Sequence, residues 1–124
     1  MGIYLADREA EIMAVLWEHG PSTVAEVREL LRDQLAYTTV QTILRNLEGK
    51  DYVGHEQEGR QHRFKALVAR DAARRSALQH LAAKLFRGSS AVLLTQMVAD
   101  ADLTDEEVQQ IRKALNARIK KSTT

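Results

Sequence analysis

The fold is decided by residues 36–47, which read Ala36-Tyr37-Thr38-Thr39-Val40-Gln41-Thr42-Ile43-Leu44-Arg45-Asn46-Leu47. Apolar residues recur there at i, i+3, i+4 and i+7, the stripe of a helix seated on a core, namely Val40, Ile43, Leu44 and Leu47. The opposite face carries hydroxyl, amide and guanidinium groups on Thr38, Gln41, Thr42 and Arg45. Such groups hydrogen-bond base edges and phosphates, whereas a solvated helix face usually carries Glu and Lys pairs. The stretch therefore predicts a DNA-reading helix, with an ordinary solvated helix as the alternative.

The helices before this stretch complete a helix-turn-helix pattern. A first helix is expected to begin at Asp7, as its N-cap, and to end at His19-Gly20-Pro21. Thr23 and Glu26 have capping-box spacing and predict the start of a second helix. Its inward residues are expected to be Val24, Val27, Leu30 and Leu31. The third helix contains the opening stretch and is expected to end at Gly49 in a left-handed cap, which gives a helix-turn-helix.

A basic β-hairpin is predicted to follow. Residues 52–56 and 61–67 flank Gln57-Glu58-Gly59-Arg60, where Gly59 can supply the positive φ of a tight turn. Phe64 and Ala66 would pack on the helices, Arg63 and Lys65 would point outward, and Arg60 would lie at the tip. A helix-turn-helix followed by such a hairpin is a winged helix. The alternative is a structural ribbon with solvated charges.

The charges are distributed unevenly along the chain, although the net charge is only +1. Acidic residues outnumber basic ones up to Gly59, and the balance then reverses between residues 60 and 75. The basic residues of that segment are Arg60, Arg63, Lys65, Arg70, Arg74 and Arg75. This asymmetry puts positive potential on one local element, where phosphates could meet it, unless it is an ordinary solvated surface.

Residues 71–124 predict amphipathic helices that leave apolar surface uncovered. Ser89-Ser90 reads as a helix cap, and Thr104 begins another capping box. Exposed apolar stripes usually mark an interface, and a second copy is the simplest partner. The expected interface residues are Leu78, Leu81, Leu85, Leu94, Val108, Ile111, Leu115 and Ile119. We therefore predict a winged-helix domain over 1–70 and a helical dimerisation domain over 71–124; the alternative is a monomer in which these helices fold back.

Length and composition exclude several classes of protein. A chain of 124 residues buries one core, or a small module with an accessory segment, and is not a multidomain enzyme. The absence of cysteine excludes disulfides and thiolate metal sites and favours a reducing cytoplasm. Residues 1–7 do not read as a signal peptide, and no apolar run approaches the roughly 20 residues of a membrane span. We expect a cytoplasmic protein that does not bind membranes directly.

No motif of a catalytic site is present. Gly-rich phosphate loops, Gly-x-Ser-x-Gly and His-Glu-x-x-His are all missing from the sequence. His55, Glu56 and His62 could face one another as a metal site, but at a wing such residues are more often solvent or phosphate contacts. The sequence thus predicts no enzyme activity, no catalytic or metal-binding residue and no cofactor.

Three blocks of the chain resemble the BlaI/MecI/CopY repressors. Residues 5–17 resemble their opening helix, in which a Glu precedes an apolar pair and Leu-Trp. Residues 37–47 look like their recognition helix, and residues 86–107 resemble their C-terminal region. The resemblance implies a winged-helix homodimer that occupies a palindromic operator in double-stranded DNA and blocks transcription. It places Thr38, Thr39, Gln41, Thr42 and Arg45 in the major groove, and Arg60, His62, Arg63 and Lys65 on the wing near phosphates.

The resemblance leaves the release mechanism open. The copper-responsive branch uses a cysteine-rich tail, which this chain lacks. The penicillinase-repressor branch is cut at an Asn-Phe bond downstream of a membrane sensor protease that responds to β-lactams. The corresponding bond here is Gln96-Met97, so control of β-lactam resistance through proteolysis stays a hypothesis. A winged helix that binds protein instead of DNA is the alternative function, because fold alone does not settle function.

Overall fold

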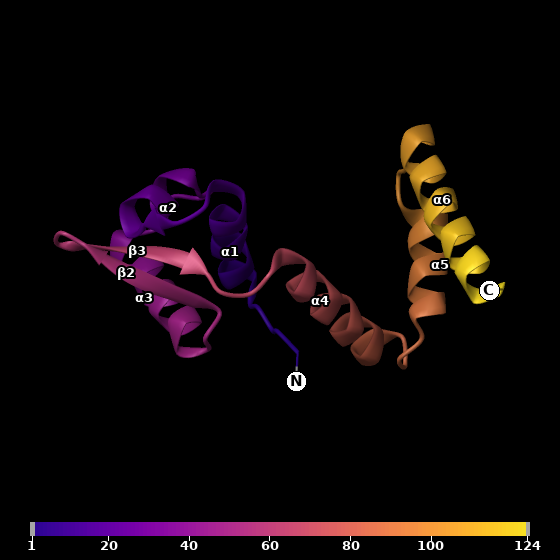
Figure 1. Ribbon diagram of the computed structural model, residues 1–124, viewed down its shortest axis with the longest axis horizontal. Coiled ribbons are helices and arrows are strands. Elements are labelled where there is room, and N and C mark those ends of the chain that lie inside the picture. The colour runs from indigo at the N-terminus through magenta and orange to yellow at the C-terminus, as the bar shows by residue number, and fades with distance from the viewer. Residues whose placement is uncertain (1, 124) are drawn as a thin grey trace. The chain divides into compact units, whose positions relative to one another are not determined.

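The computed structural model of the protein describes residues 2–123 (Figure 1). The elements follow one another as α1 (Asp7–His19), β1 (Ser22–Thr23), α2 (Val24–Leu30), α3 (Tyr37–Gly49), β2 (Val53–Glu58), β3 (Gln61–Ala66), α4 (Arg70–Leu85), α5 (Ser90–Asp100) and α6 (Asp105–Thr123). The chain divides into two compact units, one up to His80 and one from Leu81. The predicted domains, 1–70 and 71–124, stay a prediction; α4 begins at Arg70, and the first unit also includes the first part of that helix.

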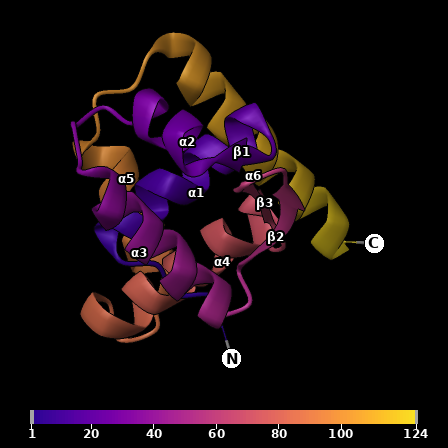
Figure 2. The same ribbon diagram turned by 90° about the vertical axis from the view of Figure 1, so that its left-hand side faces the viewer.

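The core of the first unit lies between the first three helices and the sheet. The largest side chains that are fully buried are Ile12, Met13, Val27, Val40, Leu44, Leu47 and Val53. The predicted inward face of α3 is confirmed. Val40, Leu44 and Leu47 are fully buried, and Ile43 is partly buried against the same core. The inward prediction for Leu30 is wrong, because α2 ends at Leu30 and its side chain is 45% exposed. Figure 2 shows this unit from the side toward which the hairpin of β2 and β3 projects, with α3 to the left of the hairpin.

A buried carboxylate, that of Glu9, links α1 to the residue that follows α3. The N-cap of α1 is Ala6, so the prediction of Asp7 is wrong by one residue. Glu9 Oε1 accepts the Ala6 N–H at 2.9 Å, and Lys50 Nζ lies 2.9 Å from both oxygens of Glu9. Burial opposes ionisation of Glu9, but these hydrogen bonds outweigh it and hold the pKa of Glu9 below its ordinary value. The start of α1 is thereby fastened to the end of α3.

The end of α3 differs from the prediction. Gly49 is the last helical residue, not a left-handed cap, and Lys50 follows as C-cap with φ −89°. Asp51 takes the positive φ instead, at 64°. Asp and Asn are among the few residues that adopt this conformation readily, because their short side chains can bond the local backbone.

The sheet contains the predicted hairpin and one strand that the sequence does not reveal. Its order is β1-β3-β2, with both pairings antiparallel. The hairpin is longer than predicted, because Gln57 and Glu58 belong to β2 and only Gly59 and Arg60 turn the chain. Gly59 has φ 62°, which confirms its role in the turn. Strand β1 pairs only Ser22 with Phe64 and Thr23 with Arg63.

The second unit consists of the end of α4 together with α5 and α6. Ser89 Oγ accepts the Val92 N–H at 3.1 Å, which confirms the predicted cap. Thr104 and Glu107 form the second predicted capping box, with hydrogen bonds of 3.0 and 3.1 Å. The pKa of Glu107 is lowered mainly by the Thr104 backbone N–H. Few apolar side chains of these helices are buried, Leu93 and Ala82 among them.

Candidate nucleic-acid interface

The polar face of α3 lies on the surface of the first unit. Thr38, Thr39, Thr42 and Arg45 are exposed and Gln41 is half-buried, while Val40, Leu44 and Leu47 anchor the helix from below. The Thr42 hydroxyl donates to the Thr38 carbonyl at 2.9 Å, so its oxygen lone pairs stay available to a donor. All five predicted residues of the recognition helix are therefore reachable from solvent to some degree.

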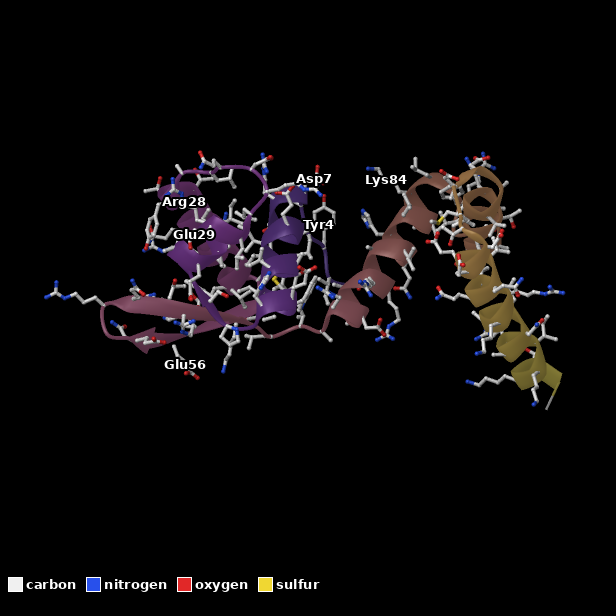
Figure 3. The ribbon with its side chains drawn as sticks, turned by 90° about the horizontal axis from the view of Figure 1, so that it is seen from above. Tyr4, Asp7, Arg28, Glu29, Glu56 and Lys84 are labelled. Atoms are coloured by element: carbon white, nitrogen blue, oxygen red, sulfur yellow. The ribbon has the colours of Figure 1, made fainter. Side chains whose placement is uncertain are left out.

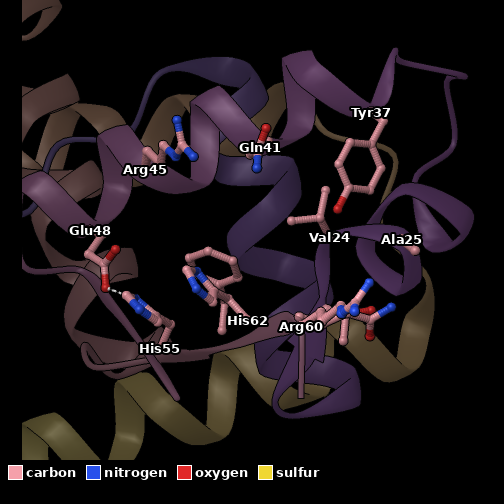
Figure 4. Close-up of a pocket in the computed structure, with 12 residues that line it drawn as sticks. Val24, Ala25, Tyr37, Gln41, Arg45, Glu48, His55, Arg60 and His62 are labelled. Carbon is pink, nitrogen blue, oxygen red and sulfur yellow. Dashed lines mark hydrogen bonds and ion pairs between the residues drawn. The ribbon is translucent and has the colours of Figure 1, made fainter. Parts of the chain in front are cut away.

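A hollow of about 390 Å³ separates α3 from the hairpin (Figure 4). We call it the recognition hollow, and it is lined by Thr23, Val24, Ala25, Tyr37, Gln41, Arg45, Glu48, His55, Arg60, Gln61, His62 and Phe64. It brings together Gln41 and Arg45 of the helix with Arg60 and His62 of the wing. The other predicted DNA contacts, Thr38, Thr39, Thr42, Arg63 and Lys65, do not line it.

Arg45 and Arg60 are the two cations of the recognition hollow. Both are exposed, and neither has a hydrogen-bond or ion-pair partner among residues 2–123. A guanidinium carries five donors in a planar fork that suits guanine edges and phosphate oxygens. Two such forks without internal partners give this hollow unused capacity for binding an anion or a base.

The two histidines of the hollow stack on each other. The His55 and His62 ring centroids are 4.3 Å apart, and His55 Nδ1 also contacts Glu48 Oε2 (Figure 4). Glu56 takes no part, because it lies 3.5 Å from Lys65 Nζ and points away from the unit (Figure 3). Within residues 2–123 no group of three or more His, Asp or Glu side chains could hold a metal ion.

Arg63 lies differently from the prediction. It is half-buried instead of pointing outward, because its guanidinium turns toward two carboxylates. Arg63 Nε donates to Glu58 Oε2 at 2.6 Å, and Nη1 donates to Glu26 Oε1 at 2.9 Å. The Glu58 contact is the main reason that the pKa of Arg63 is raised, and the same contact lowers the pKa of Glu58.

Sequence reasoning missed several residues of the recognition hollow. Tyr37 is the first residue of α3, and it immediately precedes the predicted face. The N-terminal residues of a recognition helix are the ones that contact base edges, so its position could have suggested it. His55 and Glu48 become neighbours only through the fold, and no spacing in the sequence indicates that.

The architecture of the first unit is that of a winged helix: three helices, the third polar outside, and a hairpin with Arg60 in its turn. A family model described as penicillinase repressor matches residues 5–117. The chain belongs to the penicillinase repressor family. This family consists of transcriptional regulators and not of enzymes, which confirms the predicted absence of enzyme activity.

Two curated relatives align with this chain. The transcriptional regulator BlaI of Mycobacterium tuberculosis is 41% identical over 70 residues, which cover 54% of this chain and 51% of BlaI. The chain therefore matches about half the length of that relative. The methicillin resistance regulatory protein MecI of Staphylococcus aureus is 19% identical over 116 residues, covering 92% of this chain and 94% of MecI.

Two solved structures have folds similar to that of this chain. A MarR family protein from Bacillus stearothermophilus superposes with a TM-score of 0.53 at 17% identity, covering 98% of this chain and 78% of that one. A MarR protein from Peptoclostridium difficile gives 0.50 at 16% identity, covering 95% and 71%. Both likenesses show the winged-helix fold.

Most of the residues expected at a dimer interface are exposed. Leu78, Leu81, Leu85, Leu94, Val108, Leu115 and Ile119 are exposed and Ile111 is half-buried. Gln96 and Met97 lie within α5, and both side chains are exposed. Among residues 2–123, no helix is both long and apolar enough to span a lipid bilayer.

Proposed function

We propose that the protein is a transcriptional repressor that binds a palindromic operator as a homodimer. The observation that carries the proposal is the recognition hollow, where Arg45 of α3 and Arg60 of the wing both lack an internal partner within the described residues. A DNA duplex supplies a base edge in the groove for Arg45 and a backbone phosphate for Arg60. Such a protein works in the cytoplasm, where its operator lies.

The recognition helix α3 reads bases in the major groove. Its contacts are Thr38, Thr39, Gln41, Thr42 and Arg45, none of which is fully buried. Arg45 pairs with a guanine, a contact worth about 1–3 kcal/mol of discrimination. The threonines present methyl groups to thymine and hydroxyl oxygens to donors on base edges.

The wing binds the DNA backbone. Arg60 in the turn and His62 and Lys65 on β3 face phosphates, with Arg60 as the main contact because it has no competing carboxylate among the described residues. Each phosphate neutralised releases counterions, so binding through the wing weakens as salt rises.

A second copy covers the exposed apolar residues of the C-terminal helices. Leu85 and Ile119 are 67% and 61% exposed, which is unfavourable for apolar side chains in water. A two-fold dimer would present two recognition helices, and half-sites about 34–36 Å apart would fit one turn of DNA. The operator is therefore palindromic.

Release occurs by cleavage within α5, at or near Gln96-Met97. The exposed side chains there and the similarity to a methicillin resistance regulator support this step. A cut in α5 would separate α6 from the DNA-binding unit and weaken the dimer. The partner is a membrane sensor protease, and the genes controlled include β-lactam resistance genes.

The experiment is a set of binding curves with operator and random duplexes at several salt concentrations. Fragments selected from the source genome supply the operator. We expect a palindromic fragment to bind tighter than random DNA by at least about 10³-fold, with affinity falling steeply as salt rises. Absence of affinity for any duplex in dilute buffer would refute the proposal and favour a protein-binding module.

A further inference from the structure

Arg63 joins the wing to the helical core at several points. Besides its bonds to Glu58 and Glu26, its Nη1 donates to the Pro21 carbonyl at 3.1 Å and its Nη2 lies 3.4 Å from Glu58 Oε1. The partners come from β2, from α2 and from the turn before β1. One guanidinium thus connects the hairpin with the N-terminal end of α2.

Glu26 is shared between this connection and the cap of α2. Its Oε1 accepts the Thr23 N–H at 2.9 Å as well as the Arg63 N–H, and Thr23 Oγ1 accepts the Glu26 N–H at 3.2 Å. The pKa of Glu26 is lowered first by the Thr23 backbone and further by Arg63. The orientation of the carboxylate is therefore set by the helix, and the wing bonds to a fixed point.

Arg63 also occupies the last position at which the core holds the hairpin. Strand β1 pairs with β3 only at Phe64 and Arg63. Beyond Arg63 the strands β2 and β3 pair only with each other, as Gln57 with His62 and Glu58 with Gln61. The tip that carries Arg60 and His62 thus projects from this point without further support from β1.

We propose that Arg63 is a positioning residue that holds the wing tip beside α3, and not a phosphate contact. The inference rests on the proposed DNA-binding function. A phosphate would have to displace bonds to two carboxylates and a carbonyl before Arg63 could bind it, whereas Arg60 has no such competitor within residues 2–123. Arg63 acts through Arg60 and His62, which it keeps within the recognition hollow.

The first readout is amide hydrogen exchange in the free, full-length protein. Arg63→Ala should accelerate exchange at residues 57–62 by about tenfold or more, because the tip loses its anchor. Lys65→Ala is the matched control: it removes a cation from the same strand whose carboxylate neighbour, Glu56, lies within the hairpin. We expect Lys65→Ala to leave exchange at the tip unchanged.

The second readout is operator binding in a double-mutant cycle. Arg60→Ala should weaken binding about tenfold in the wild-type background and less than about threefold when Arg63 is already alanine, because a loose tip no longer delivers Arg60 to its phosphate. Arg63→Lys keeps the charge but not the planar fork, so it should resemble Arg63→Ala. A phosphate contact would instead tolerate lysine. Arg63→Lys also serves as the test if the alanine variant does not fold.

The proposal is overturned if Arg63→Ala leaves exchange at the tip unchanged, if the effects of the two arginines on binding are additive, or if lysine restores affinity. If the wild-type protein binds no DNA at all, the proposed function fails. Hydrogen exchange then still decides, by itself, whether Arg63 anchors the wing.

Discussion

At the residue scale, the protein contrasts arginines that are bonded internally with arginines that are not. Arg63 is bonded to two carboxylates, whereas Arg45 and Arg60 have no partner within residues 2–123. The distinction cannot be drawn from the sequence, because Glu26 and Arg63 are separated by 37 positions. Composition shows only that a basic segment exists. The fold decides which of its charges are available to a ligand.

Replacing Arg45 should change sequence preference more than it changes affinity for random DNA. Arg45→Ala removes a bidentate donor to guanine, so the ratio of operator to random affinity should fall by about 5–150-fold, corresponding to 1–3 kcal/mol. Binding curves with both duplexes measure the ratio. Arg74→Ala is the control, because Arg74 is also exposed and without a partner among the described residues. Equal losses on both duplexes would show that Arg45 does not read bases.

Removing the buried carboxylate of Glu9 should destabilise the first unit. Glu9→Gln keeps the shape but loses charge-assisted bonds to Lys50, so we expect the free energy of unfolding to fall by about 1–3 kcal/mol. Urea unfolding at pH 7 measures it. A change within about 0.5 kcal/mol, the usual range for surface substitutions, would mean that this bridge is not important.

The same carboxylate should make stability depend on pH in the acid range. The pKa of Glu9 is lowered in the folded protein, so its contribution is present at neutral pH and is lost as pH falls below about 4. The difference in unfolding free energy between wild type and Glu9→Gln should therefore shrink between pH 6 and about pH 3. A difference that stays constant or grows on acidification would contradict this assignment. Urea titrations at each pH give the values.

At the scale of elements, the sequence predicts those that depend on local pattern. The apolar stripe of α3, the two capping boxes and the Gly59 turn are all found as expected. The features that the sequence does not predict correctly are set by tertiary contacts or by single residues at the ends of elements. Strand β1 has only two residues, too few to show alternation, and Asp51 takes the positive φ expected of Gly49.

Replacing Gly59 and replacing Gly49 by alanine should change the free energy of unfolding in opposite directions. Gly59 has φ 62°, where a Cβ atom is strained, so Gly59→Ala should lower the free energy of unfolding by about 1–2 kcal/mol. Gly49 is helical, and a Cβ there meets nothing within 4 Å, so Gly49→Ala should raise it by up to about 1 kcal/mol. Urea unfolding of the pair measures both. Similar shifts in one direction would mean that the hairpin turn differs from the one described.

At the scale of the whole molecule, the chain combines a well-buried unit with one that exposes much of its apolar surface. The sequence predicts this contrast from the stripes of the C-terminal helices, and the exposure of Leu85 and Ile119 agrees with it. In the proposed dimer, the same residues of a second copy cover this apolar surface.

A charge on the C-terminal stripe should dissociate the proposed dimer. Leu115→Glu places a carboxylate in the interface, so the dissociation constant should rise at least about tenfold. Leu30→Glu is the matched control, because Leu30 is 45% exposed and Leu115 is 47% exposed. Light scattering at micromolar concentration measures the mass. A wild-type protein that is monomeric there would refute the dimer, and equal effects of both variants would refute the interface.

The claim that the polar face of α3 lies in the major groove is tested most directly by nuclear magnetic resonance of the full chain with a selected operator duplex. Irradiation of the DNA protons should transfer saturation to amide protons between Thr38 and Arg45, and to those of the wing around Arg60. Amide protons of α5 and α6 should be unaffected. Saturation confined to other segments, with none along α3, would contradict the account.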